Sequence, residues 1–433
     1  MQSGIFPTSL TSTSIPDFIS LRRTEDKNAR ETAARILSDV QSRGFSAIAA
    51  YSRKFDAFNL TKQNCLITRE EFDEAASRVT PGQRQAMRKM KGRLESFALL
   101  QKSKMDDVSQ KSKDGTTTLK FMPVERVGIY VPAGRAPLFS SLFMAAVPAC
   151  IAGVQDLVVC TPPQKDGKAN PFILAAARMC GIDKVCKLGG VQAIGAMAFG
   201  VEGLIRPVDV VCGPGNAYVS AAKQIVASSG VRIDVPAGPS EVLVIADQSA
   251  NPSFVAADML AQAEHGADSA AICICTSMRL AERVSQELAA QLASLPTQNP
   301  ARQSIPKWGR IFVVRDIDVA LDAANALAPE HLELMVADAL KWLPKIKNAG
   351  AVFLATGEAF CDYGMGCGNH ILPTNSSARA WGGVSVQTFG KWMYVESLSA
   401  GAQQRLACVS ALLARIEGLE AHARAAEKRA GGD

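Results

Sequence analysis

The stretch Val208-Asp-Val-Val-Cys-Gly-Pro-Gly-Asn-Ala-Tyr218 has the pattern of a short buried strand that passes through a glycine turn into a helix. Glycine permits the tight backbone geometry of such a turn, and it also lets backbone N–H groups approach a phosphate at the positive end of the helix dipole. The pattern is not GxGxxG, and no acidic residue stands at the spacing expected for a ribose contact. A cofactor-binding turn and an ordinary strand-to-helix turn therefore both remain open.

The same alternation of short β-branched runs and alanine-rich helical segments extends in both directions from this stretch. In the first half of the pattern, strands are predicted at residues 127–132, 157–162, 185–188 and 208–212. In the second half, they are predicted at residues 241–246, 270–276, 310–314 and 351–354. Such alternation is typical of βαβ units and a parallel sheet. The sequence predicts an α/β fold with two Rossmann-like doubly wound lobes that meet near residues 232–239.

The flanking segments have helical patterns. Thr68 with Glu71 forms a capping box, and Thr80-Pro81 opens a long basic amphipathic helix. Residues 104–120 have the composition of a loop or a hairpin. We expect a helical N-terminal portion packing on the second lobe, two α/β lobes and a helical C-terminal tail that docks on its own subunit or on a neighbour. The corresponding ranges are 1–126, 127–235, 236–380 and 381–433.

Composition excludes several classes of protein. With 48% hydrophobic and 20% charged residues, the 433-residue chain is typical of a soluble globular protein, and it lacks a run of the ~18 uncharged apolar residues that cross a bilayer. The net charge of +6 is mild, and the basic cluster at 84–93 is more typical of a solvated helix face than of a nucleic-acid site. Eleven cysteines without a CxxC motif fit buried thiols in a reducing cytosol. Since residues 1–30 lack an apolar signal segment, we expect a mature cytoplasmic protein without membrane or nucleic-acid partners.

Two further motifs could bind a cofactor or an ion. Leu188-Gly-Gly-Val-Gln-Ala-Ile194 repeats the glycine turn one unit earlier, and two such turns at the carboxyl ends of neighbouring strands favour a nucleotide crevice. Gln262 and His265 are three residues apart on one predicted helix face, so both could reach a common ion. Alternatively, His265 caps the C-terminus of its helix, with Gly266 as the following residue.

Two other segments carry polar residues whose role the pattern leaves open. The glycine-rich loop from 360 to 370 presents Asp362 and His370 after an apolar strand, where either a functional loop or a solvated surface loop would fit. Glu417 and His422 lie on the predicted tail helix, five residues apart. At helical periodicity they are about 140° apart around the axis, so a solvated helix face is the default interpretation.

Glu330 and His331 stand side by side after Pro329, in a segment predicted to be a loop. A carboxylate beside an imidazole offers two groups for proton transfer near neutral pH. The chain contains four histidines, which are His265, His331, His370 and His422. Because the other three also stand in polar or glycine-bounded settings, we predict that all four belong to one active site.

Taken in order, these segments resemble histidinol dehydrogenase from about residue 30 to 424. The stretches that carry the resemblance are VGIYVPAGRAPLFSS, GGVQAIGAMAFG, GPGNAYV, AGPSEVLVIAD, AQAEHG, APEHLEL, NHILPT and EGLEAH. The resemblance implies a homodimeric zinc- and NAD-dependent enzyme of histidine biosynthesis. Such an enzyme oxidises L-histidinol through L-histidinal to L-histidine by transferring two hydrides.

The resemblance also implies roles for individual residues. The implied zinc ligands are Gln262, His265, Asp362 and His422, of which the last comes from the tail of the partner subunit. Glu330 matches the residue that activates water, and His331 matches the base. The other implied substrate contacts are Ser240, His370 and Glu417. The implied NAD contacts are Tyr130, Gln192 and Asn216.

The loop before His370 differs from the family pattern, with Cys361 at a glycine position and an extra residue before Asn369. A changed loop leaves open a related dehydrogenase of another small polar alcohol, such as a sulfonated propanediol. A catalytically silent metal-binding protein is a third hypothesis, which the intact Glu330-His331 pair disfavours.

Overall fold

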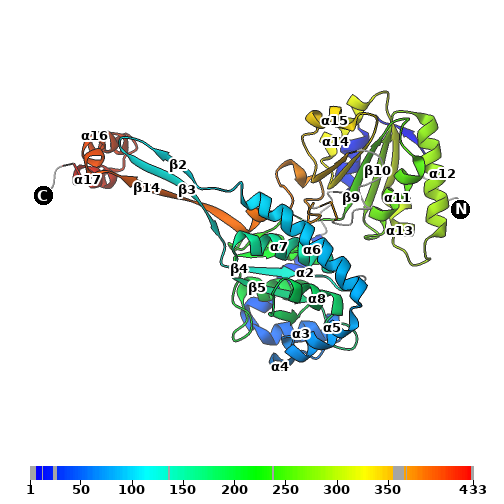
Figure 1. Cartoon of the computed structure of the whole chain (residues 1–433), viewed down its shortest axis with the longest axis horizontal. Helices are drawn as coiled ribbons and strands as arrows, with labels where there is room; N and C mark the ends of the chain where they lie inside the picture. Colours follow the sequence, from blue (N-terminus) through cyan, green and yellow to red (C-terminus); the bar gives the residue numbers. More distant parts are fainter. Residues whose placement is uncertain are drawn as a thin grey trace.

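The computed structural model describes residues 6–11, 13–22, 27–134, 137–236, 238–354, 365–366 and 368–430. Two α/β lobes lie next to each other, and a narrow arm extends away from them (Figure 1). The prediction of two doubly wound lobes is confirmed. Helical segments before and after the lobes are also present, but their arrangement differs from the prediction.

The first lobe is built on a parallel sheet with the strand order β6-β5-β4-β7-β8. Its strands are β4 (Arg126–Tyr130), β5 (Asp156–Thr161), β6 (Val185–Lys187), β7 (Val210–Cys212) and β8 (Arg232–Ile233). Its helices are α7 (Phe139–Ala152), α8 (Pro171–Met179), α9 (Gly190–Phe199) and α10 (Ala217–Ala227). Helices α7 and α8 share one apolar core, and α9 and α10 share another. The two cores cover opposite faces of the sheet, as in a doubly wound fold.

The second lobe has a parallel sheet with the strand order β1-β11-β10-β9-β12-β13. Its strands are β1 (Thr8–Ser9), β9 (Glu241–Ala246), β10 (Ala270–Cys275), β11 (Gly309–Val313), β12 (His331–Met335) and β13 (Ala351–Leu354). Its helices are α1 (Ser14–Arg22), α11 (Pro252–Ala263), α12 (Met278–Ser294), α13 (Ala301–Trp308), α14 (Ile317–Leu327) and α15 (Ala339–Trp342). Helices α11 to α13 cover one face, and α1 and α14 cover the other. The chain enters this lobe twice, because β1 and α1 precede the first lobe in sequence.

The expectation that the N-terminal portion packs on the second lobe is wrong for most of its length. After α1, the helices are α2 (Lys27–Arg43), α3 (Phe45–Asp56), α4 (Lys62–Cys65), α5 (Arg69–Arg78) and α6 (Pro81–Lys102). Helices α2 and α3 pack on α9, α5 packs on α8, and α6 packs on α7. Helices α2 and α9 approach each other closely at Gly195 of α9, because a Cβ there would lie 3.0 Å from Val40 and 3.2 Å from Leu37. An amphipathic pattern predicts an apolar helix face but does not identify the surface that it covers.

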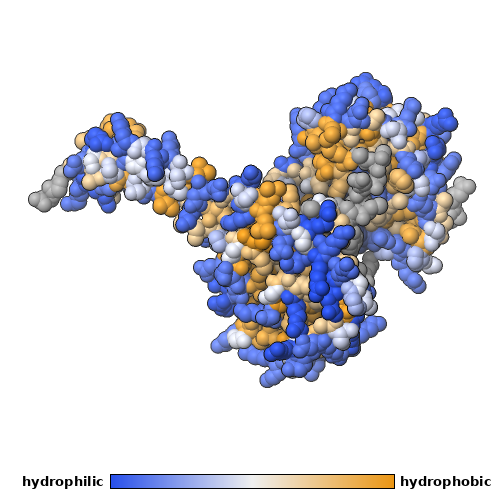
Figure 2. All heavy atoms as spheres, viewed as in Figure 1, coloured by the Kyte–Doolittle hydropathy of each residue, from blue (hydrophilic) through white to orange (hydrophobic). Residues whose placement is uncertain are grey.

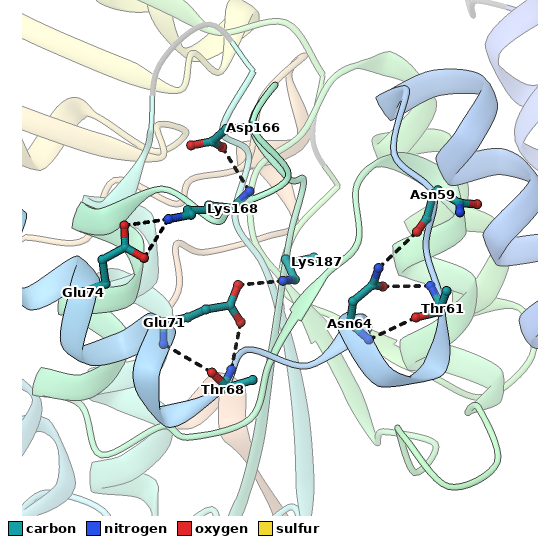
Figure 3. Close-up of polar contacts among 9 residues, drawn as sticks. All are labelled: Asn59, Thr61, Asn64, Thr68, Glu71, Glu74, Asp166, Lys168 and Lys187. Atoms are coloured by element: carbon teal, nitrogen blue, oxygen red, sulfur yellow. Dashed lines mark hydrogen bonds and ion pairs between the residues drawn. The ribbon is translucent and has the colours of Figure 1, made fainter.

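Polar contacts also attach this helical portion to the first lobe (Figure 3). Lys187 at the end of β6 donates to Glu71 of α5 at 2.7 Å, and Lys168 donates to both carboxylate oxygens of Glu74 at 2.6 and 2.7 Å. Glu71 also accepts from the backbone N–H of Thr68, which completes the predicted capping box. Helix α5 is therefore held to the lobe by Glu71 in its first turn and by Glu74 near its middle.

The arm is a three-stranded antiparallel sheet that ends in two helices. Strands β2 (Val108–Lys111) and β3 (Gly115–Pro123) form the hairpin that was one of the predicted alternatives, and β14 (Gly390–Leu398) pairs along the whole of β3. At the tip lie α16 (Ala400–Ile416) and α17 (Glu420–Glu427) (Figure 1). The prediction of an entirely helical tail is wrong at β14, because its pairing partner lies far away in sequence.

Apolar side chains are exposed along this arm, where Figure 2 shows hydrophobic spheres at several points. Tyr394 of β14 is 73% exposed, and Ile416 of α16 is 75% exposed. Exposed apolar surface of this kind commonly marks a contact with another macromolecule. No helix in the described ranges is long and apolar enough to span a membrane, and the cysteines in those ranges are free thiols.

Candidate active site

Glu330 and His331 lie at the amino-terminal edge of the second sheet. Helix α14 ends at Leu327, and the chain turns at Ala328, which has a positive φ of 51°. Glu330 belongs to this connection, as predicted, whereas His331 is the first residue of β12. Both are nearly inaccessible to solvent, with exposed fractions of 6% and 3%. The two side chains are therefore fixed by the sheet rather than carried on a surface loop.

Glu241, the first residue of β9, contacts both side chains through its backbone. Its N–H donates to Glu330 Oε2 at 2.9 Å, and its carbonyl oxygen lies 3.4 Å from His331 Nδ1. A carbonyl can only accept a hydrogen bond, so His331 Nδ1 carries the proton in this contact. Nε2 of the neutral ring is then the acceptor nitrogen. It lies 3.3 Å from Nδ1 of His370, which can donate to it.

The Glu330 carboxyl group has an unusual proton affinity. Burial raises its pKa to about 8, and the neighbouring Glu241 carboxylate acts in the same direction. Hydrogen bonds from the Glu241 N–H and from Gln262 Nε2 oppose this rise. A carboxyl group with a pKa near neutrality can both accept and release a proton, which is the property required of a general acid or base.

Gln262 and His265 come from the end of α11, beside Glu330. Gln262 Nε2 donates to Glu330 Oε2 at 3.3 Å, while its Oε1 is buried and has no hydrogen-bond partner among the described residues. Leaving such an atom unpaired costs about 1–3 kcal/mol, so this oxygen is suited to a ligand. Helix α11 already ends with Glu264 as its C-cap, which places His265 beyond the cap. His265 is exposed in the single chain, but desolvation by the surrounding atoms and the nearby His370 lower its pKa, which favours the neutral imidazole that binds metals.

His370 completes the group of side chains around His331. The two rings have centroids 5.4 Å apart, and Phe353 of β13 lies 5.8 Å from His370. The preceding residue, Asn369, donates to the backbone oxygen of Met144 in α7 at 2.6 Å. Because α7 belongs to the first lobe, this contact places the His370 segment between the two lobes.

Ser240 directly precedes Glu241 and is half-buried. Its carbonyl oxygen accepts from the N–H of Ala270 at 2.9 Å, which fixes the segment between β9 and β10. Asp362, which the resemblance implies as a metal ligand, lies outside the described residues. Within the described ranges, no three His, Cys, Asp or Glu side chains form a group that could hold a metal ion. Among the described residues, Gln262 and His265 therefore form only part of a metal site.

The glycine turns of the first lobe meet at the carboxyl end of β4. Tyr130, the last residue of that strand, accepts a hydrogen bond from the N–H of Gly190 at 3.1 Å. Gly213 has a φ of 122°, and a Cβ at this position would lie 2.0 Å from the Tyr130 carbonyl oxygen, so only glycine fits. Asn216 caps α10 by accepting from Val219 N–H at 3.1 Å. This strand edge is where doubly wound sheets bind nucleotides.

Gln192 is buried next to these turns, and its partner was not found from the sequence. Its Nε2 donates to Asp56 Oδ2 at 3.3 Å, across a separation of 136 residues. Burial raises the pKa of Asp56 to about 6, although its hydrogen bond with Gln192 lowers it. Asp56 ends α3 in the N-terminal portion, and no local pattern connects it with the first lobe. It could be found only from the packing of α3 on α9.

Glu417 and His422 do not join this site in their own chain. Glu417 is the C-cap of α16, and His422 lies in α17, at the tip of the arm and far from the second lobe (Figure 1). Both residues are exposed. The structure therefore brings Glu330, His331, Gln262, His265 and His370 together, and it leaves the two tail residues on a projecting element.

Comparison with known proteins identifies the family to which this chain is related. The family model described as histidinol dehydrogenase matches residues 20–430. Histidinol dehydrogenase from Xanthomonas euvesicatoria pv. vesicatoria is 43% identical over 406 residues, which cover 93% of each chain. The enzyme of that name from Lactococcus lactis subsp. lactis is 39% identical over 410 residues, again covering 93% of each chain.

The overall fold is also shared with a solved structure. The crystal structure of histidinol dehydrogenase from Elizabethkingia anophelis has a TM-score of 0.91 and 35% sequence identity, covering 99% of this chain and 98% of the other. The agreement extends over the lobes, the N-terminal portion and the arm, since almost the whole of both chains is covered. The chain belongs to the histidinol dehydrogenase family.

Proposed function

We propose that this protein oxidises L-histidinol through L-histidinal to L-histidine with NAD as the hydride acceptor. The observation that carries the proposal is the buried Glu330-His331 pair, oriented by the backbone of Glu241 and facing the segment between the lobes. Family membership gives the substrate class, and the geometry gives the pair its chemical roles. The reaction would complete the last steps of histidine biosynthesis.

His331 would act as the base in both oxidation steps. With Nδ1–H donating to the Glu241 carbonyl oxygen, Nε2 can accept the hydroxyl proton of the alcohol as the hydride leaves. The same nitrogen would accept a proton from the aldehyde hydrate in the second oxidation. His370 lies within hydrogen-bond distance of Nε2 and would contact the substrate at this position.

Glu330 would activate the water that adds to the aldehyde. Its raised pKa, about 8, makes the carboxylate a stronger base than an exposed glutamate. The hydrogen bonds to its Oε2 from Glu241 N–H and Gln262 Nε2 hold the group in place. The two members of the pair would thus have separate tasks, one at the alcohol and hydrate and the other at water.

The residues around Gln262 fit a zinc ion. The unpaired, buried Gln262 Oε1 and the neutral imidazole of His265 are suitable ligand atoms. Asp362 of the same chain and His422 of the partner subunit would complete the set. Zinc bound there would hold the imidazole and amine of the substrate beside the cofactor. Ser240 and the partner's Glu417 would contact the polar groups of the substrate.

NAD would bind at the carboxyl edge of the first sheet. Tyr130, Gln192 and Asn216 surround the two glycine turns there, and the N-terminus of α10 offers its dipole to the pyrophosphate. The second lobe carries the catalytic pair on its opposite, amino-terminal edge. The cofactor and the substrate would therefore meet between the lobes, beside His370.

The active site would be shared by two subunits of a homodimer. The projecting arm, with its exposed apolar strand β14 and helix α16, supports this arrangement, because neither surface is covered in a single chain. Placing the arm tip on the second lobe of a partner would bring Glu417 and His422 to Gln262 and His265. The free, mostly buried thiols support a location in the cytoplasm.

The experiment is a substrate screen with the purified protein. L-Histidinol and a series of small polar alcohols, including a sulfonated propanediol, are compared for NADH production before and after treatment with a chelator. We expect turnover of L-histidinol and its loss on removal of the metal. Preferred turnover of another alcohol would refute the proposed substrate, and full activity in metal-free protein would refute the zinc site.

Subunit mixing tests the shared site. His422→Ala and His331→Asn homodimers are each expected to be inactive, and a mixed dimer would contain one intact site that takes His331 from one subunit and His422 from the other. Recovery of activity in the mixture is the expected result. A mixture that forms mixed dimers but remains inactive would contradict the exchange of the tail.

A further inference from the structure

We infer that Arg22 and Glu241 form a positioning pair, through which the N-terminal helix α1 holds the Glu330-His331 pair in its reactive arrangement. The inference rests on the proposed function of Glu330 and His331, and it assigns a role to two residues outside the proposed substrate and cofactor contacts.

Glu241 is the common support of the catalytic pair. Its backbone N–H holds Glu330, and its backbone carbonyl holds His331 through Nδ1. Ser240, a proposed substrate contact, is the preceding residue. A displacement of the first residue of β9 would therefore move the water-activating group, the base and a substrate contact at the same time.

The Glu241 side chain points to Arg22, and both side chains are buried, with 2% and 3% of their surface exposed. Arg22 Nε lies 3.7 Å from Glu241 Oε2. The remaining guanidinium nitrogens donate to backbone oxygens: Nη2 to Pro239 at 3.0 Å and Nη1 to Asp268 at 2.7 Å. One guanidinium thus holds the chain on both sides of Ser240 and the segment that follows His265.

Arg22 is itself held by the second lobe. It is the last residue of α1, and its guanidinium lies 5.3 Å from the ring centroid of Trp308 and 6.0 Å from that of Phe18. The short strand β1, just before α1, pairs with β11 of the same sheet. The N-terminal segment is therefore anchored at both its ends, and Arg22 projects from it to the rear of the catalytic edge.

A buried ion pair of this kind is a poor device for stability alone, because desolvation of the two charges offsets much of their attraction. The planar guanidinium of Arg22, in contrast, bonds two backbone oxygens in fixed directions while its Nε faces the Glu241 carboxylate, an arrangement that a lysine ammonium group cannot reproduce. The contacts join the segment at Pro239 and Glu241 to the segment at Asp268, on either side of the catalytic pair. This arrangement fits a group that fixes geometry.

The test compares Arg22→Met and Arg22→Lys with a matched control, Arg310→Met. Arg310 also lies over the Phe18 ring, at 5.7 Å, but within the described part of the chain its guanidinium donates only to local oxygens of Lys307 and Gly309. We expect Arg22→Met to lower kcat about 100-fold, the scale of a misplacement of about 1 Å, with little change in the KM for NAD. Arg22→Lys should lower kcat by a smaller factor, and Arg310→Met should leave it within about twofold of the wild type.

Thermal unfolding and crystal structures of the variants separate positioning from general stability. A kcat of Arg22→Met equal to that of Arg310→Met, or a loss that follows only the fraction of unfolded protein, would overturn the inference. The structure of Arg22→Met should show Glu330 or His331 displaced by about 0.5 Å or more, the tolerance of a preorganised site. Unchanged positions of both side chains would overturn the positioning role of Arg22, whether or not the wild type oxidises histidinol. If the wild type does not oxidise histidinol, the proposed function is refuted separately.

Discussion

Replacing Lys223 with Met should destabilise the first lobe strongly, because Lys223 and Asp234 form an ion pair whose side chains are only 2% and 0% exposed. Lys223 Nζ also donates to the carbonyl oxygen of Gly213 at 2.9 Å, and Asp234 Oδ2 accepts from the N–H of Gly213 at 2.7 Å. The pair therefore holds both peptide groups of the glycine turn. The substitution would leave Asp234 buried without its cation.

The expected loss follows from this burial. Removing one partner of a buried ion pair costs about 3–5 kcal/mol, whereas an exposed pair contributes about 1 kcal/mol or less. Lys184→Met is the matched control, since the pair of Lys184 with Asp156 has a lysine that is 55% exposed. In urea unfolding, Lys223→Met should lose several times more free energy of unfolding than the Lys184→Met control.

The same substitution should raise the KM for NAD, because the Gly213 turn leads into Asn216 and α10. The KM for histidinol, which would bind at the second lobe, should change little in the protein that remains folded. Equal losses of unfolding free energy in Lys223→Met and Lys184→Met would refute the assignment of a buried, uncompensated charge. A large loss of stability with unchanged NAD binding would refute the link between the pair and the cofactor turn.

Three further outcomes are expected. His331→Asn should lower turnover by about 100-fold or more while the metal content and the dimer are retained, as removal of a general base predicts; activity near that of the wild type would exclude His331 as the base. Gly213→Ala should weaken NAD binding in a fluorescence titration, because its Cβ would overlap the Tyr130 carbonyl oxygen; unchanged affinity would show that the turn can shift at no cost. Burial raises the pKa of Asp258 to about 6 and that of its neighbour Glu333 well above its usual value. An acidic group with a raised folded-state pKa stabilises the fold below its unfolded pKa and loses this effect as the pH rises through the folded pKa. The melting temperature should therefore fall as the pH rises from about 4 through 6. Glu333→Gln should flatten this pH dependence, and a variant with the same pH profile as the wild type would contradict the assignment to Asp258 and Glu333.

The lobes could be predicted from the sequence because their signals are local. Strands β9 and β13 begin and end where the apolar runs do, and the remaining predicted strands differ by at most two residues at either end. Strands β6, β7, β9 and β10 are buried along their whole length, so each reads as a nearly continuous apolar segment. The glycine turns at Gly190 and Gly213 were also visible, since a positive φ requires glycine there.

Other elements depend on contacts that no local pattern contains. Strand β12 was missed because its short run includes the charged residue Glu333, which is buried against Asp258 of α11. Strand β14 was missed because it pairs with β3, more than 250 residues earlier, and exposes apolar residues that a partner would cover. The lobe on which the N-terminal helices pack likewise depends on the shapes of the two contacting surfaces.

In the candidate site, too, some residues have a local sequence signal and others depend on contacts with residues far away in sequence. The dipeptide Glu330-His331 and the pair Gln262 and His265 could be selected from residue type and spacing. The groups that orient them, Glu241 and Arg22, could not, since a buried charge reads as a surface residue when only the sequence is considered. Positioning groups become visible only when their partners, distant in sequence, are placed beside them.

The most direct test is the number of NADH molecules formed for each L-histidinol consumed by the purified protein. If His331 serves as the base in both oxidations and Glu330 supplies the intervening water, limiting L-histidinol should yield two NADH per molecule and L-histidine as the product. One NADH per molecule with release of the aldehyde, or no turnover of L-histidinol, would contradict the proposed function.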